Sequence, residues 1–249
     1  MDSPAIEANQ LSISYRTGRG PKKPAVSDLS FGVGRGEIVG FIGPNGAGKT
    51  SAIKALLGLI PSPGDSCRIL DIRSSDPRSR ASLGYLPEVS YYPRFLRLLE
   101  FLYICAWLSG IPRRARKDAV RTAARRTGMT EHLNSRMFGF SKGMLQQSGI
   151  AQALVHNPDI LILDEPMSGL DPIARMKMRE LLVELRSEGK TILFSSHELG
   201  EIEMVADRIL VLCQGRLVYD GAVSEAVGMD GNLERAFIRL LGEELPCAA

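Results

Sequence analysis

Cysteine is scarce in this chain of 249 residues, and the four cysteines stand far apart, at Cys67, Cys105, Cys213 and Cys247. No two of them form a C-x-x-C pair, and no pair of histidines lies near them. The sequence therefore offers neither a zinc-finger pattern nor a disulfide framework. Because disulfide-rich proteins belong to oxidising compartments, this scarcity favours a reducing one, and we expect the cytoplasm.

Long hydrophobic runs are missing too. The longest unbroken apolar stretch is Phe101–Leu108, far shorter than the ~20 residues that a membrane-spanning helix needs. Residues 1–10 lack the apolar core of a secretion signal. We therefore expect a chain that is neither secreted nor membrane-spanning. With 44% hydrophobic and 24% charged residues and a mean hydropathy of −0.01, the composition is that of a globular protein.

Charge of one sign is in small excess, since 31 basic and 28 acidic residues give a net charge of +3. The basic residues are concentrated in one segment, which includes Arg113, Arg114, Arg116, Lys117, Arg121, Arg125 and Arg126. A solvated helix face and a face toward anionic lipid headgroups are both compatible with this cluster. Because no aromatic residues interleave with the charges, we expect no nucleic-acid partner.

The apolar pattern predicts an α/β fold. Continuous apolar runs such as Ile160–Leu163 indicate strands buried on both faces of a mostly parallel sheet. More regular alternation in the early and late strands indicates an antiparallel flank. The predicted strands are Leu11–Tyr15, Leu29–Val33, Glu37–Ile42, Arg68–Leu70, Leu83–Leu86, Ile160–Leu163, Thr191–Ser195 and Arg208–Leu212, followed by a hairpin around Gly215.

Helical periodicity replaces strand signals in the middle of the chain. We expect one domain, in which an α/β core of residues 1–87 and 158–249 is interrupted by a helical subdomain at residues 88–157. The segment Phe95–Ile111 holds more apolar residues than one buried helix face needs. It forms either the core of that subdomain or a docking groove for a partner. A further helix is expected at Asn232–Leu241.

Residues 43–50 read Gly-Pro-Asn-Gly-Ala-Gly-Lys-Thr and match the phosphate-binding pattern G-x-x-x-x-G-K-[ST]. They follow an apolar strand and precede a helical pattern, as that pattern requires; the alternative is a glycine-rich turn that only caps a helix. Backbone N–H groups of such a loop converge on phosphate oxygens. Lys49 would reach the β- and γ-phosphates and Thr50 would ligate Mg²⁺. The expected nucleotide-binding residues are Gly43, Pro44, Asn45, Gly46, Ala47, Gly48, Lys49, Thr50 and Ser51.

Two acids, Asp164 and Glu165, end the apolar strand at Ile160–Leu163. The carboxyl ends of parallel strands are where α/β sheets bind ligands. Neighbouring residues of a strand point to opposite sides, so the two acids should differ in role. We expect Asp164 to hold Mg²⁺ with Thr50, and Glu165 to deprotonate a water that attacks the γ-phosphate. The alternative is a pair of helix-capping acids.

Residues 140–144 read Phe-Ser-Lys-Gly-Met at the start of an expected helix. With the preceding motifs, this segment resembles the L-S-G-G-Q signature of ATP-binding cassette (ABC) transporter ATP-binding subunits, and the resemblance covers nearly the whole chain. In that family the signature reaches across a dimer to the γ-phosphate held by the other subunit, which implies ATP-binding roles for Ser141 and Gly143. Ordinary N-capping is the alternative for Ser141. Lys142, which departs from the signature, either brings charge toward phosphate or points to solvent.

Four further residues match positions of the family, and the resemblance implies their roles. Asp171 corresponds to the acid of a loop that connects the two sites of the dimer; the alternative is a polar turn in which Asp171 caps the helix that starts at Pro172. His197 corresponds to a histidine that hydrogen-bonds the γ-phosphate, and Tyr15 to an aromatic residue that stacks on adenine. Glu88 stands where the family usually has a glutamine near Mg²⁺ and the attacking water, so we expect it to serve both metal binding and catalysis.

The resemblance implies an enzyme that hydrolyses ATP with Mg²⁺ and with Lys49, Glu88, Glu165 and His197 as its catalytic residues. It also implies a homodimer or heterodimer of cassettes that powers a separate multi-spanning permease from the inner face of the cell membrane. Residues 140–144 and Glu88 look more like exporter-type than importer-type cassettes. Two alternatives stay open: a soluble ABC-type ATPase that acts on nucleic acid or ribosomes, and a P-loop kinase or GTPase.

Overall fold

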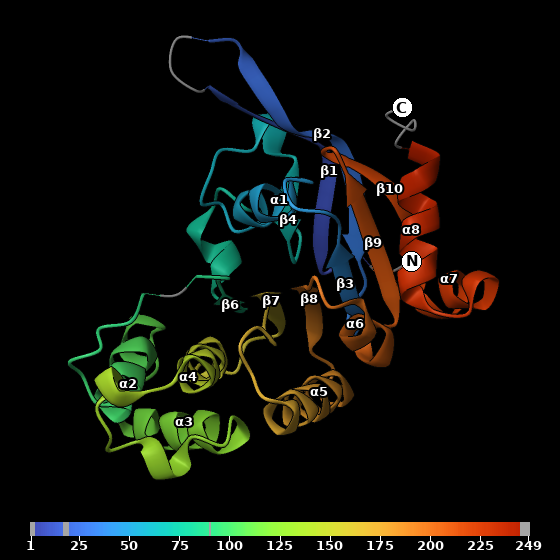
Figure 1. Ribbon diagram of the computed structural model, residues 1–249. Coiled ribbons are helices and arrows are strands. Elements are labelled where there is room, and N and C mark those ends of the chain that lie inside the picture. Colours follow the sequence, from blue (N-terminus) through green and yellow to red (C-terminus); the bar gives the residue numbers. More distant parts are fainter. Residues whose placement is uncertain (1–2, 17–19, 90, 245–249) are drawn as a thin grey trace.

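The computed structural model describes residues 3–16, 20–89 and 91–244 and contains two sheets (Figure 1). The larger sheet has six strands in the order β10-β9-β3-β8-β7-β6, with β10 antiparallel to β9 and the other neighbours parallel. This arrangement confirms the predicted parallel core and the final hairpin. The strands are β3 (Ile38–Ile42), β6 (Leu83–Leu86), β7 (Ile160–Asp164), β8 (Thr191–Ser195), β9 (Arg208–Cys213) and β10 (Arg216–Ala222).

The smaller sheet has four strands in the order β2-β1-β4-β5, and all of its pairings are antiparallel. This confirms the predicted antiparallel flank. Tyr15 lies near the end of β1, where it pairs with Lys23 of β2. The strands are β1 (Ile6–Arg16), β2 (Lys22–Val33), β4 (Cys67–Ile69) and β5 (Ile72–Arg73).

Strand β7 shows how the larger sheet is buried on both faces. Ile160 and Ile162 pack into a core shared with the smaller sheet and α1 (Lys49–Leu56). Leu161 and Leu163 pack on the opposite side, into a core shared with the helices. Each of these side chains is buried, and burial of one such side chain stabilises the fold by about 1.5–3 kcal/mol. The carboxyl end of β7, which carries Asp164, is therefore firmly held.

The remaining helices fall into two groups (Figure 1). Helices α2 (Leu98–Leu108), α3 (Arg113–Arg126) and α4 (Lys142–Leu154) pack on one another. The second group follows α4 along the chain and consists of α5 (Pro172–Ser187), α6 (Leu199–Val205), α7 (Val223–Asp230) and α8 (Leu233–Glu244). In this group α6 contacts α5 and α8, and α7 contacts α8. Helix α8 confirms the expected C-terminal helix, whereas α7 was not expected. Short 3₁₀ helices lie at Pro63–Asp65, Pro77–Arg80, Thr130–His132 and Met137–Gly139.

The apolar excess of Phe95–Ile111 is divided between core and surface. Leu98, Leu102 and Ala106 of α2 are fully buried, whereas Trp107 and Leu108 are exposed. The buried side chains explain why α2 forms, and the exposed ones leave an apolar surface at its C-terminal end. Within residues 3–16, 20–89 and 91–244, no helix is both long enough and apolar enough to cross a bilayer.

Candidate functional site

A cavity of about 400 Å³ lies where β3 and β7 end, beside the N-terminus of α1. Most residues that the sequence predicts to bind nucleotide or metal line this cavity, together with Ala25, which was not predicted. The other predicted residues, Gly43, Pro44, Ser141, Gly143, Asp171 and His197, do not line it. The lining residues are Tyr15, Ala25, Asn45, Gly46, Ala47, Gly48, Lys49, Thr50, Ser51, Glu88, Asp164 and Glu165.

The phosphate-binding loop is tied to strands on both sides. Gly48 precedes α1 with φ +104°, and a Cβ at this position would lie 2.4 Å from the carbonyl oxygen of Ala25. Only glycine fits there, because a side chain would meet both backbone strain and a clash. The N–H of Gly215, in the β9–β10 turn, donates to the carbonyl of Ala47 over 2.9 Å. The loop therefore has a defined shape that presents its backbone to the cavity.

Lys49 is held at this loop by two carbonyl groups. Its Nζ donates to the carbonyl oxygens of Gly43, over 2.5 Å, and Pro44, over 3.3 Å. Burial lowers the pKa of Lys49, while the carboxylates of Glu165, Asp164 and Glu88 act to raise it. The ammonium group thus faces the carboxylate side of the cavity, where an anionic phosphate would also be attracted.

Tyr15 stands at the edge of the cavity with 45% of its surface exposed. Its hydroxyl donates to Oγ of Ser51, the residue after Thr50 in α1, over 3.2 Å. This hydrogen bond fixes the ring relative to the phosphate-binding loop. An exposed aromatic face held in this way is suited to stack on a flat heterocycle.

Asp164 is only 3% exposed, and its two carboxylate oxygens differ in their hydrogen bonding. Oδ1 accepts a 2.5 Å hydrogen bond from Oγ of Ser195, whereas Oδ2 is buried without a hydrogen bond in the described part of the chain. Burial raises the pKa of Asp164; the Ser195 hydrogen bond opposes this, and Glu88 adds to it. With Thr50 and Glu88 lining the same cavity, the unpartnered oxygen belongs to an all-oxygen donor set of the kind that Mg²⁺ prefers. These residues therefore fit the expected metal.

Glu165 occupies a strained position that several contacts hold. Its φ is +54°, which is uncommon for a residue with a side chain. Its N–H donates to Oγ of Ser195 over 3.0 Å, and its carbonyl accepts from Nε2 of Gln146 over 2.8 Å and from the N–H of Ser168 over 3.1 Å. Its carboxylate Oε2 lies 2.7 Å from Nδ1 of His197. His197, outside the cavity wall, thus still reaches the site.

Residues 140–144, which resemble the family signature, lie outside the cavity. Ser141 is exposed and caps α4, its Oγ accepting from the N–H of Met144 over 3.2 Å. The N-capping that the sequence analysis gave as the alternative for Ser141 is therefore present, at an exposed helix N-terminus. Lys142 points neither to the cavity nor simply to solvent, because its Nζ donates to Oγ of Ser168 over 3.3 Å. The side chain of Lys142 also lies against Gly169: a Cβ added at Gly169 would be 2.6 Å from Cδ of Lys142.

Asp171 caps the next helix in the same way. Its Oδ1 accepts from the N–H of Ala174 over 2.8 Å, at the N-terminus of α5. Asp171 is exposed and lies two residues after the turn at residues 166–169. The capping hydrogen bond gives this segment a defined path beside the signature.

Two residues that contact the site were not assigned roles from the sequence. Ser195 bonds both Asp164 and Glu165, and Gln146 bonds Glu165 from α4. Ser195 is detectable in principle, since it ends the strand paired with β7 and lies opposite Asp164 in register. Gln146 carries no comparable signal, because its contact depends on how α4 packs.

Comparisons with known proteins agree with this geometry. Residues 26–168 match the family described as ABC transporter. An uncharacterised ABC transporter ATP-binding protein of Synechocystis is 38% identical over 94% of this chain and 68% of its own length. A solved ATP-binding subunit of an ABC transporter is 30% identical, with a TM-score of 0.85 over 95% of this chain and 99% of its own.

A second solved structure, a dimeric ATP-binding cassette in a post-hydrolysis state with ADP and phosphate, has a TM-score of 0.80. It covers 87% of this chain and 98% of its own, at 21% identity, which is a likeness of fold. The family match spans more than half of the chain, and the Synechocystis relative is similar almost throughout. This chain therefore belongs to the ABC transporter family, as an ATP-binding cassette with the fold and the ATPase activity of that family.

Proposed function

We propose that two copies of this cassette, or this cassette and a related one, enclose two ATP molecules between them. The observation that carries the proposal is the position of Ser141. The cavity contains the phosphate-binding loop and both carboxylates, whereas Ser141 and Gly143 lie outside it at the exposed N-terminus of α4. A helix N-terminus with a serine hydroxyl is an anion site. In a pair of cassettes, that site completes the coordination of the partner's triphosphate.

Within one cassette, each residue of the cavity has a distinct task. The backbone of residues 43–51 and the Lys49 ammonium bind the β- and γ-phosphates, and Tyr15 stacks on adenine. Asp164, Thr50 and Glu88 hold Mg²⁺, which offsets negative charge on the phosphate oxygens when bound. The γ-phosphate then accepts a water molecule and its bond to the bridging oxygen of ADP breaks.

Glu165 is the base of this reaction. Its carboxylate orients the water and takes its proton, and His197 holds that carboxylate through the 2.7 Å contact with Oε2. The backbone of Glu165 is strained at the point where its side chain lines the cavity. Asp171 and the turn that precedes it form the contact through which the two cassettes sense each other.

We further propose that hydrolysis drives a separate membrane-spanning permease. A second cavity, of about 620 Å³, lies between α2 and the α/β core and is lined by Leu59, Tyr85 and Leu108, among others. Leu59 and Leu108 are 60% and 73% exposed, so the cavity offers an apolar groove for a short helix of the permease. Such docking places the chain on the cytoplasmic face of the membrane. The likeness of residues 140–144 and Glu88 to exporter-type cassettes favours export.

The permease proposal is tested by purifying the tagged chain from detergent-solubilised membranes of its source. A multi-spanning protein should accompany the unmodified chain and be lost from Leu108→Asp. Ile238→Asp is the matched control, since Ile238 of α8 is 70% exposed but lies away from the groove. Both variants should keep Mg²⁺-dependent ATP hydrolysis. Recovery of ribosomes or nucleic acid, with no membrane protein, would instead support a soluble ABC-type ATPase.

A further inference from the structure

A closed ring of contacts joins Glu165, the turn that follows it, and the turn that carries His197. The first half of the ring runs along the chain: the N–H of Ser168 donates to the carbonyl of Glu165 over 3.1 Å. Leu170, two residues later, accepts a 3.1 Å hydrogen bond at its carbonyl oxygen from Nε of Arg175. Arg175 lies on the first turn of α5, just after the Asp171 cap.

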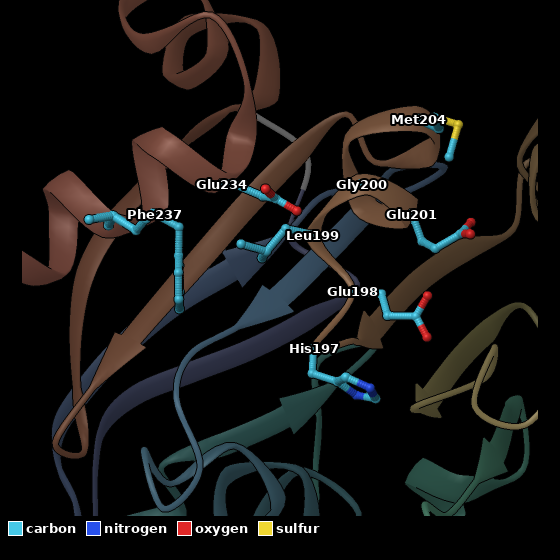
Figure 2. Close-up of a pocket in the computed structure, with 9 residues that line it drawn as sticks. His197, Glu198, Leu199, Gly200, Glu201, Met204, Glu234 and Phe237 are labelled. Atoms are coloured by element: carbon cyan, nitrogen blue, oxygen red, sulfur yellow. The ribbon is translucent and has the colours of Figure 1, made fainter.

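The second half of the ring returns through a carboxylate beside His197. Nη1 of Arg175 donates to Oε2 of Glu198, the residue after His197. His197 in turn contacts Oε2 of Glu165, which closes the ring. Figure 2 shows that the side chains of Glu198 and Glu201 extend to the same side as the His197 ring. Arg175 is therefore the link between the turn at residues 168–171 and the turn at residues 196–198.

The chemistry of arginine suits this link. A guanidinium group donates from several nitrogens held in one plane, so it can bond a carbonyl and a carboxylate at once. The side chains of Arg175 and Glu198 are 28% and 31% exposed, so neither is fully solvated. A lysine at this position would donate from a single nitrogen and could not span the same two acceptors equally well.

A second ion pair on the same helices provides a natural contrast. Arg179, one turn further along α5, pairs with Glu201 of α6 over 2.7 Å. Both pairs join α5 to the start of α6, and their arginines are similarly exposed. Nη1 of Arg175 also lies 3.9 Å from Oε1 of Glu201, so the two pairs meet at Glu201. Of these two arginines, only Arg175 also has a hydrogen bond to the turn at residues 168–171 within the described part of the chain. Loss of Arg179 therefore weakens the helix contact and leaves the ring closed.

We propose that Arg175 is a positioning residue that couples the turn at residues 168–171 to His197. When a second cassette contacts this turn, the shift of the Leu170 carbonyl is transmitted through Arg175 and Glu198 to the imidazole that holds Glu165. Each site then becomes competent only when the cassettes have met. This inference rests on the proposed dimeric ATPase and adds the residue through which pairing is sensed.

Arg175→Met, which keeps a long side chain but removes the donors, tests this coupling. We expect kcat to fall about tenfold, while the Kd for a fluorescent ATP analogue changes by less than about twofold. Arg179→Met should retain kcat to within about twofold. Arg175→Lys should recover part of the rate, because it retains a donor for Glu198. Should Arg175→Met fail to fold, Glu198→Met removes the carboxylate acceptor, opens the ring from its other side and should lower kcat similarly.

Dependence on His197 separates coupling from a purely structural role. In a His197→Ala chain, adding Arg175→Met should change the residual kcat by less than about twofold, because the residue through which Arg175 acts is gone. Equal losses in Arg175→Met and Arg179→Met, or a full further loss in the His197→Ala chain, would overturn the inference. A Glu165→Gln chain should pair in ATP with or without Arg175. If that chain stays monomeric, the proposed function itself fails, and the coupling falls with it.

Discussion

His197 and Glu165 meet through Nδ1 and Oε2, 2.7 Å apart, although 31 residues separate them along the chain. Because the side chain of His197 is 63% exposed and that of Glu165 only 13%, the imidazole closes the outer side of the carboxylate. We expect His197→Ala to lower kcat by about 100-fold, since an unheld base is poorly aligned. Steady-state ATPase assays measure this. A variant with more than about half of the original kcat would show that Glu165 is held without His197.

Tyr15 should contribute to nucleotide affinity through its ring and not through its hydroxyl. Tyr15→Ala should weaken ATP binding by about 1–3 kcal/mol, which is about 5- to 150-fold in Kd. Tyr15→Phe removes only the hydrogen bond to Ser51 and should stay within about threefold. Titration of each variant with a fluorescent ATP analogue measures both. Similar losses in the two variants would assign the effect to the hydroxyl.

Glycine should be needed far more at position 48 than at position 46. Both residues have positive φ, but a Cβ at Gly48 would lie 2.4 Å from the Ala25 carbonyl, whereas a Cβ at Gly46 meets nothing within 4 Å. Gly46→Ala should cost only the backbone strain, about 1 kcal/mol. Gly48→Ala should cost clearly more and abolish nucleotide binding. Urea unfolding of the two variants measures the difference, and equal costs would contradict the clash.

Asp164 should lower the stability of the cassette without nucleotide at neutral pH. Burial raises the pKa of this carboxyl in the folded state, so the folded chain binds its proton more tightly than the unfolded chain does. Stability therefore falls as the pH rises through the window from the unfolded-state pKa to the raised folded-state pKa, and it stays lower above that window. We expect Asp164→Asn to be more stable than the original chain at pH 8 by roughly 1 kcal/mol.

Thermal unfolding at several pH values measures this effect. The advantage of Asp164→Asn should shrink as the pH is lowered through the window from the folded-state pKa of Asp164 down to its unfolded-state pKa, because the original carboxyl also becomes neutral there. The same variant should lose Mg²⁺-dependent hydrolysis. An advantage that is independent of pH would show that the buried charge is not its cause.

Functional residues that belong to contiguous sequence motifs could be predicted. The loop at residues 43–51 and the acids Asp164 and Glu165 each form one contiguous motif, and the apolar run before the acids indicates a doubly buried strand. Their meeting in one cavity follows from the parallel order of β3, β8 and β7, because the carboxyl ends of these strands share an edge.

Contacts between distant residues were not predictable. From the sequence, Lys142 was expected either to bring charge toward phosphate or to point to solvent. In the structure its Nζ donates to Oγ of Ser168. The ring through Arg175 and Glu198 depends on how α5 packs beside α6, for which a single sequence holds no signal. The nearly all-apolar segment at residues 95–111 likewise did not reveal that Leu98 would be buried and Leu108 exposed.

The most direct measurement of the central claim mixes two inactive variants. Glu165→Gln lacks the base, and Ser141→Ala lacks the group that completes the partner's site, so each alone should hydrolyse ATP at least about 100-fold more slowly than the original chain. In a mixed dimer, one site combines an intact Glu165 with an intact Ser141 from the other copy. An equal mixture should recover up to about a quarter of the original rate, as random pairing predicts. A mixture no faster than its separate components would contradict the account, because Ser141 would then not serve the site of a second copy.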